Sequence, residues 1–166
     1  MKKWFIPLAV IAVFLFAVYS WAKGFNNNAV VLQEDAKTTW SNVESAYQRR
    51  NDLIGNLVKT VQGAADFEKS TLTEVINARA KATSTSINVG DLSAANMAKF
   101  QQAQAGLSGA LSKLLVSVER YPDLKSNANF LELQSQLEGT ENRINVARDR
   151  FNEGVNNYNK HIKIFP

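Results

Sequence analysis

The chain has 166 residues, 45% of them hydrophobic, and a formal net charge of +4. This length and composition suffice for one folded domain with a hydrophobic core. The basic residues are scattered and do not form the dense basic face of nucleic-acid-binding proteins, so we expect no nucleic-acid partner. The absence of cysteine excludes disulfides and thiol catalysis.

Residues 4–22 form the first predicted element, an uncharged stretch that reads WFIPLAVIAVFLFAVYSWA. A helix of this length extends about 28 Å, which is close to the hydrocarbon thickness of a bilayer. Trp4, Tyr19 and Trp21 lie near its two ends, where aromatic rings favour the headgroup region. We therefore predict that residues 1–25 hold a cytoplasmic stub and a transmembrane helix that anchors the chain in a lipid bilayer.

This apolar stretch has two alternative interpretations. One is a buried core helix, which is the least favoured because the stretch has so little polar pattern. The other is a secretory signal peptide, because the closing Ser-Trp-Ala resembles a cleavage site. The stretch is longer than the apolar region of a typical signal peptide, which favours a retained anchor. Lys2 and Lys3 precede it, whereas only Lys23 follows it closely. The positive-inside rule then places the N-terminus in the cytoplasm and residues 26–166 outside it.

Residues 26–166 carry apolar side chains at helical spacings of three and four. We expect four helices, over residues 26–64, 66–86, 94–120 and 127–163. Asp66 is a predicted helix cap, and Gly90 and Pro122 lie in predicted connections. Short connections between amphipathic helices favour an all-α fold, in which the transmembrane helix is followed by an elongated antiparallel four-helix bundle. The three asparagines at 26–28 either break the chain below the membrane or lie on a helix continuous with the anchor.

The segment QRRNDLIGNLV, residues 48–58, places two consecutive arginines in an apolar helical repeat. On a helical wheel of about 100° per residue, Arg50 lies within the apolar arc, whereas Arg49 points to solvent. The same construction places further charged residues on or beside the apolar faces of the other helices. The predicted interior charge network comprises Arg50, Glu68, Arg79, Glu119, Glu141 and Arg148.

The predicted network is formally neutral, and an arginine can bridge two carboxylates at once. Paired charges are tolerated in a protein interior, where they fix helix register more than they add stability. The alternative is that each long side chain extends from the flank of its helix into water.

Four segments carry unusual motifs in a fixed order: WSNVESAYQRRNDLIGNLVKTVQG (residues 40–63), the pair Glu68 and Arg79, ERYPDLKSNANFLELQSQLEGTENRINVAR (119–148) and FNEGVNNYNKHIKIFP (151–166). Together they resemble the LemA family. The resemblance implies a single-pass protein of the bacterial cell envelope, here placed in the inner membrane, with one transmembrane helix and an elongated four-helix bundle. It implies no reaction, and relatives associated with magnetosome membranes suggest an organising role.

The sequence departs from the family pattern at two places. The family usually has proline where this chain has Gly55, and glycine costs about 1 kcal/mol of helix propensity while permitting a straighter helix. The family also continues beyond the final Phe165-Pro166. We therefore expect residues 26–166 to be a bundle domain that lacks a short C-terminal tail.

We expect no catalytic, cofactor or metal site. His161 is the only histidine, and the sequence has no metal-binding motif. Asn152, Asn156 and Asn159 recur on one helix face and could contact a partner, although a solvated flank is the favoured interpretation.

The favoured function is therefore that of a non-enzymatic, membrane-anchored scaffold or adaptor. It would present its bundle to other envelope proteins or to a second copy of itself as a homo-oligomer. The alternative is a binding module that senses a small anion or a peptide with its charged interior, for which the arginines supply the donors.

Overall fold

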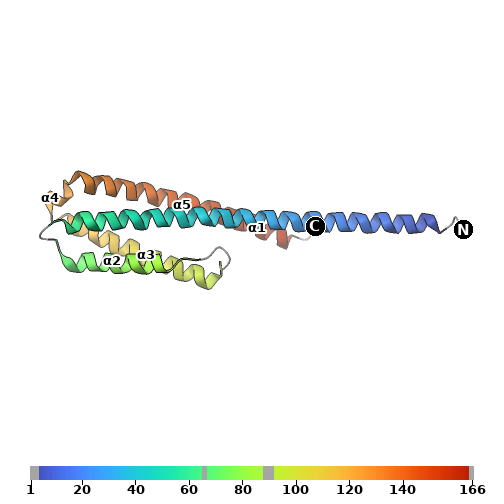
Figure 1. The fold of residues 1–166 in the computed structure, drawn as a ribbon, viewed down its shortest axis with the longest axis horizontal. Helices are drawn as coiled ribbons and strands as arrows, with labels where there is room; N and C mark the ends of the chain where they lie inside the picture. The colour runs from blue at the N-terminus through green and yellow to red at the C-terminus, as the bar shows by residue number, and fades with distance from the viewer. Residues whose placement is uncertain (1–3, 65–66, 88–91, 165–166) are drawn as a thin grey trace. The chain divides into compact units, whose positions relative to one another are not determined.

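The computed structural model describes residues 4–64, 67–87 and 92–164. These residues form helices and their connections, with no strand among them, which confirms the all-α fold class. The helices are α1 (Phe5–Gln62), α2 (Lys69–Ser84), α3 (Ala94–Val118), α4 (Pro122–Lys125) and α5 (Ala128–Lys163) (Figure 1). The chain divides into two compact units: the terminal unit, Met1–Thr39 with Arg150–Pro166, and the central unit, Trp40–Asp149.

α1 is one uninterrupted helix, so the asparagines at 26–28 lie within it and do not break the chain. The segment that we predict to span a membrane is exposed along its length, with Trp4, Tyr19 and Trp21 at 83%, 64% and 53% exposure. Among the described residues it is the one stretch long and apolar enough to cross a membrane, and none of its apolar window is buried inside the protein. It is therefore not the core helix of a soluble domain.

The start of α3 has a side-chain cap, whereas the predicted cap of α2 lies outside the described residues. α2 begins at Lys69, later than predicted, and both Asp66 and Gly90 lie outside the described residues. α3 begins after Ser93, whose hydroxyl oxygen accepts a hydrogen bond from the backbone N–H of Asn96 at 3.3 Å. This bond satisfies one of the N–H groups that a helix start leaves free.

The connection that starts at Pro122 forms the short helix α4, where the sequence predicts only a break. Proline disrupts the interior of a helix, but it suits the first helical position because that residue needs no N–H donor. α5 begins after Asn127, whose side-chain oxygen accepts hydrogen bonds from the backbone N–H groups of Asn129 and Phe130 at 3.0 and 3.2 Å. This cap explains why α5 starts at the predicted place.

The central unit is built around a hydrophobic core to which all five helices contribute. Ile54, Leu57 and Val61 of α1 are fully buried and follow the predicted spacing of three and four. α2 and α3 pack side by side in this unit (Figure 1). The other buried core residues are Leu53, Val58, Phe67, Leu72, Val75, Ala82, Leu107, Ala110, Leu114, Val118, Leu124, Phe130 and Leu137.

A cluster of aromatic rings lies beside this core. Phe100 of α3 meets the ring of Trp40 with its centroid 5.6 Å away and the ring of Tyr47 with its centroid 4.9 Å away, both edge to face. Edge-to-face pairs at such distances are favourable beyond the area that they bury. The aromatic cluster therefore stabilises the packing of α1 against α3.

In the terminal unit, α5 packs against the part of α1 that precedes Trp40. A Cβ at Gly154 would lie 3.4 Å from the Cα of Ala36 and 3.4 Å from Oγ1 of Thr39. Further along α5, the ring of His161 stacks on that of Phe25 with centroids 4.4 Å apart, and its Nε2 lies 2.9 Å from the Phe25 carbonyl oxygen. The contact on α1 thus moves back along the chain as α5 advances, so these two segments run in opposite directions.

Gly55 makes room for Arg79 of α2 against the backbone of α1. A Cβ at residue 55 would lie 3.0 to 3.2 Å from three atoms of the Arg79 guanidinium group. Nε of Arg79 donates a hydrogen bond to the backbone oxygen of Asn51 at 2.7 Å. The missing side chain at residue 55 therefore allows an arginine to reach a helical carbonyl.

Replacing Gly106 or Gly139 with alanine is expected to raise the free energy of unfolding by about 0.5–1 kcal/mol, because alanine favours the helix and nothing lies within 4 Å of the new methyl group. The same change at Gly55 is expected to bring no gain, since its methyl group displaces Arg79 and weakens the charge-assisted bond to Asn51. Denaturant unfolding followed by circular dichroism compares the variants. An equal gain at Gly55 would show that Arg79 moves aside freely.

Candidate functional site

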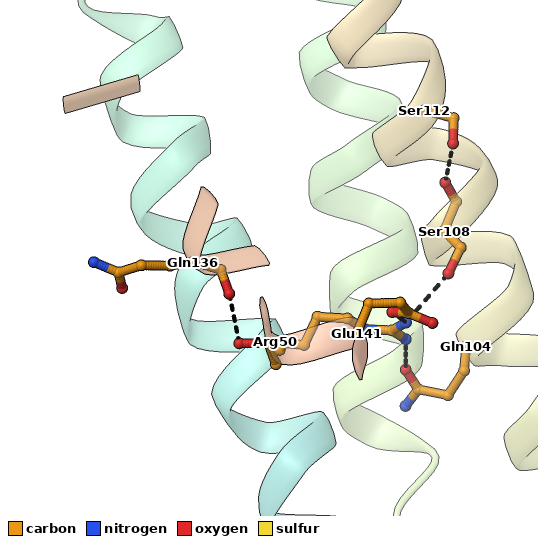
Figure 2. A network of polar contacts seen from close by, with 7 residues as sticks. Arg50, Gln104, Ser108, Ser112, Gln136 and Glu141 are labelled. Atoms are coloured by element: carbon orange, nitrogen blue, oxygen red, sulfur yellow. Dashed lines mark hydrogen bonds and ion pairs between the residues drawn. The ribbon is translucent and has the colours of Figure 1, made fainter. Parts of the chain in front are cut away.

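Arg50 is the buried charge at the centre of the polar interior of the central unit. The residue lies on the apolar face of α1 and is 4% exposed. Its Nη1 donates hydrogen bonds to Glu141 Oε2 of α5 and to Ser108 Oγ of α3, both at 3.2 Å, and its Nη2 donates to Gln104 Oε1 of α3 (Figure 2). One side chain thus links α1 to both α3 and α5.

Tyr47 extends this network to the preceding turn of α1. The guanidinium carbon of Arg50 lies 4.9 Å from the centre of the Tyr47 ring, within the range of a cation–π contact. Burial raises the pKa of the Tyr47 hydroxyl, and the positive charges of Arg148 and Arg50 oppose that rise. Tyr47 therefore stays neutral near pH 7 and lies under the influence of both arginine charges.

Two predicted members of the interior network, Glu68 and Glu119, lie at the surface, so this part of the prediction is wrong. Glu68 accepts a hydrogen bond from Arg120 at 3.1 Å, and Glu119 is ion-paired with Lys125. Hydrogen bonds from Ser70 and Arg120 hold the pKa of Glu68 below its ordinary value. Glu68 immediately precedes α2 and Glu119 immediately follows α3, so a wheel that assumes a continuing helix misplaces both.

The remaining predicted members have different surroundings. Arg50 and Glu141 are paired directly, although the Glu141 side chain is 52% exposed. Arg148 is exposed, and its positive charge opposes the rise in the Tyr47 pKa. Arg79 is half-buried and bonds a backbone carbonyl instead of a glutamate. The structure therefore contains a small network around Arg50 in place of the predicted set of six charges.

The predicted network lacked Gln104 and Ser108, the two partners of Arg50 on α3. Gln104 is 4% exposed and lies between Phe100 and Leu107 at helical spacing, on the same buried face. It occupies a skipped position of the apolar stripe, as Arg50 does on α1. An uncharged polar residue at such a position is a signal that a search for charges alone passes over.

A cleft of about 250 Å³ opens beside Arg50. Leu111 and Leu137 are among its apolar lining residues, whereas Arg50, Glu138 and Glu141 are among the polar ones. The two carboxylates repel anions, and the terminal nitrogens of Arg50 are already bonded within the protein. The cleft is therefore better suited to an apolar side chain than to a small anion.

The other predicted surface features lie outside this network. Asn152 and Asn156 are exposed, whereas Asn159 is partly buried. Within residues 4–64, 67–87 and 92–164, no group of three or more histidine, aspartate or glutamate side chains is placed to hold a metal ion.

The sequence is similar to known proteins over most of its length. The profile of the LemA family matches residues 39–166. The chain is 28% identical to magnetosome protein MamQ of Magnetospirillum gryphiswaldense, over 84% of this chain and 58% of that protein. It is 27% identical to magnetosome protein MamQ 1 of Paramagnetospirillum magneticum over the same shares. It is 23% identical to protein LemA of Metamycoplasma hominis, over 99% of this chain and 70% of that protein. The chain thus spans little more than half the length of the MamQ proteins.

Proposed function

This chain belongs to the LemA family, and we propose that it is a membrane-anchored, non-enzymatic scaffold or adaptor of the bacterial cell envelope. The proposal rests on the composition of α1. The same helix bears an exposed apolar segment of membrane-spanning length and then supplies Arg50 and much of the core of the central unit. The apolar segment and the core residues of the central unit therefore belong to one continuous helix.

The order of charges supports the orientation. Lys2 and Lys3, which lie outside the described residues, precede the apolar segment, and a cytoplasmic N-terminus follows from the positive-inside rule. We infer that the protein crosses the inner membrane once and that its central unit is extracytoplasmic. The names of the MamQ relatives, which are magnetosome proteins, support a role at an organised membrane.

The packing of the central unit supports a structural role. α1, α2, α3 and α5 share one core, and we infer that they alternate in direction as an antiparallel four-helix bundle, because their connections are short. The two terminal nitrogens of Arg50 donate hydrogen bonds to partners in α3 and α5, and we infer that these bonds fix the relative register of the helices. Such a unit offers stable outer faces to envelope proteins or to a second copy of the chain.

The anchor is tested by comparing the full chain with a variant that lacks residues 4–22. We expect the full chain to remain in the membrane fraction after an alkaline carbonate wash, and the variant to become soluble. N-terminal sequencing of the mature full-length protein is the companion measurement. Material that begins after Ala22 would show a cleaved signal peptide and would contradict the anchor.

The scaffold role is tested by photocrosslinking in intact cells. A photoreactive residue replaces Val116, Leu131 or Val146, which are 72%, 50% and 50% exposed and lie outside the core. We expect discrete crosslinked products with envelope proteins or with the chain itself, confined to one or two of these positions. Products no stronger than those of a partner-less membrane protein expressed at the same level would contradict the role.

Peptide binding is the second candidate, favoured by the cleft beside Arg50. Its apolar lining accepts an aliphatic or aromatic side chain, while Glu138 and Glu141 disfavour anionic ligands. A photoreactive residue at Leu111, which lines the cleft, distinguishes this role from the scaffold role. Crosslinks from residue 111 that residue 116 does not give would favour the peptide-binding module.

A further inference from the structure

The C-terminal end of α5 lies beside the part of α1 that follows the predicted membrane segment. His161 stacks on Phe25 and contacts its carbonyl oxygen, and the Trp21 ring stacks in turn on Phe25 with centroids 6.3 Å apart. Phe25 is only three residues past Ala22, or about 4.5 Å along the helix. These contacts hold the end of α5 within the distance of a lipid headgroup from the end of the span.

The residues that follow His161 advance toward the span, because α5 runs opposite to α1 in this unit. Ile164 continues the last turn, since its N–H donates to the Lys160 carbonyl oxygen at 3.0 Å. With a rise of about 1.5 Å per residue, Lys163 and Ile164 come level with residues 22–23. The last turn of α5 therefore ends where α1 enters the bilayer, if the span is embedded as proposed above.

The side chains at this end of the terminal unit combine positive charge with exposed apolar surface. Lys160, Lys163 and Lys23 are exposed, and Ile162 and Ile164 are 44% and 65% exposed. No aspartate or glutamate occurs in residues 21–28 or 157–164, so the three lysines have no acidic neighbour in these stretches. We call these five residues the headgroup patch.

The dipole of α5 favours lysines in its last turn. It does not explain why the exposed residues Ile162 and Ile164 lie next to Lys163. A bilayer surface accounts for both, because apolar side chains enter the boundary region while lysines meet phosphate groups. Each lysine near an anionic bilayer surface strengthens binding by about fivefold. The combination fits a lipid surface better than it fits water.

We propose that the headgroup patch is a second membrane contact, which binds the anionic phospholipid headgroups around the point where α1 enters the bilayer. This inference rests on the proposed membrane anchor. α5 would then be held at its end by lipid as well as by α1. The terminal unit would sense the charge of the surrounding bilayer through the three lysines.

The absence of native cysteine makes a site-specific test direct. The full-length Ile164→Cys variant is labelled with a fluorophore and reconstituted into vesicles that contain a lipid with a spin-labelled headgroup. The vesicles are made of phosphatidylcholine alone or of phosphatidylcholine mixed with phosphatidylglycerol. A label at Val116→Cys of the central unit is the control for a surface position. A label at Phe14→Cys reports insertion of the span, in matching vesicles whose lipid is spin-labelled in the acyl chain instead.

We expect the label at residue 164 to be quenched, and more strongly in the phosphatidylglycerol vesicles. Lys160→Glu/Lys163→Glu is expected to reduce the ratio of quenching in anionic to neutral vesicles to about one. The matched reversal Lys59→Glu/Lys99→Glu, at exposed lysines of the central unit, should leave this ratio unchanged. Circular dichroism confirms that each variant is folded.

The outcomes separate the headgroup patch from the anchor. A label at residue 164 that is no more quenched than one at residue 116, while residue 14 is strongly quenched by lipids labelled in the acyl chain, overturns the patch alone. Equal quenching at residue 164 in both kinds of vesicle overturns the preference for anionic headgroups. An unquenched residue 14 overturns the anchor and the patch together.

Discussion

Replacing Glu141 with alanine is expected to lower the free energy of unfolding by about 3 kcal/mol, although the glutamate side chain is 52% exposed. The cost arises from its partner, because Arg50 carries a positive charge and is 4% exposed. Removing the carboxylate leaves a buried cation without a counter-charge, which typically costs 3–5 kcal/mol. The lower end of that range applies here, since water can reach the pair through the cleft that both residues line.

Denaturant unfolding of the detergent-solubilised protein, followed by circular dichroism, measures this effect. Glu138→Ala is the matched control, because Glu138 lines the same cleft but interacts with Gln134 on its own helix at 3.4 Å. We expect the control to cost less than about 0.5 kcal/mol. Equal costs at the two glutamates would show that the Arg50 charge does not depend on Glu141.

A second substitution sharpens the test. In the Glu141→Ala background, Arg50→Met should restore part of the lost stability, because it removes the unpaired cation and keeps an apolar side chain of similar length. Buried ion pairs can often be replaced by apolar residues without net loss. If the free-energy costs of Glu141→Ala and Arg50→Met measured singly add up to the cost of the double variant, the two charges are not coupled.

Trp40→Ala is expected to lower the free energy of unfolding by about 3–5 kcal/mol. Trp40 is 2% exposed and packs edge to face on Phe100. Its Nε1 donates to the carbonyl oxygen of Ile87 at 3.4 Å. The substitution removes the largest fully buried side chain of the chain's described part and leaves a cavity between α1 and α3. A loss of this size is a large fraction of the stability of a typical domain.

The same unfolding experiment tests Trp40, with two reference variants. Trp40→Phe keeps a ring against Phe100 and loses the bond to Ile87, so it should cost less than half as much as alanine. Val116→Ala, at a site that is 72% exposed, should change stability by less than about 0.5 kcal/mol. A Trp40→Ala cost similar to that of Val116→Ala would mean that the aromatic cluster does not stabilise the central unit.

The helices were predictable because their buried apolar residues recur at spacings of three and four. Leu57 and Val61 are buried as that spacing requires, and the buried position of Arg50 was visible as a charge in the same stripe. Asn127 was predictable as a helix start because its side chain replaces missing backbone acceptors. These signals are local, so a single sequence contains them in full.

The partners of the buried charge were less predictable, because they depend on how helices meet. The spacing on α5 placed Glu141 beside an apolar face, but nothing local distinguished it from Glu119, which lies at the end of α3 and pairs with Lys125. Gln104 was overlooked because it carries no charge. The pairing of Arg79 with a backbone carbonyl depends on the space left at Gly55, which no pattern within α2 reveals.

The bond from Arg79 to the Asn51 carbonyl has a consequence for residue 55 itself. In a regular helix that carbonyl accepts the amide hydrogen of residue 55, four positions later. An imino acid in mid-helix is costly partly because it strands this acceptor, and partly because its ring crowds the same carbonyl. The guanidinium group donates to this carbonyl as well, but the Cβ of an imino acid would lie as close to it as that of alanine, 3.0 to 3.2 Å from three of its atoms. A proline at residue 55 would thus remove one donor to the Asn51 carbonyl and crowd the other.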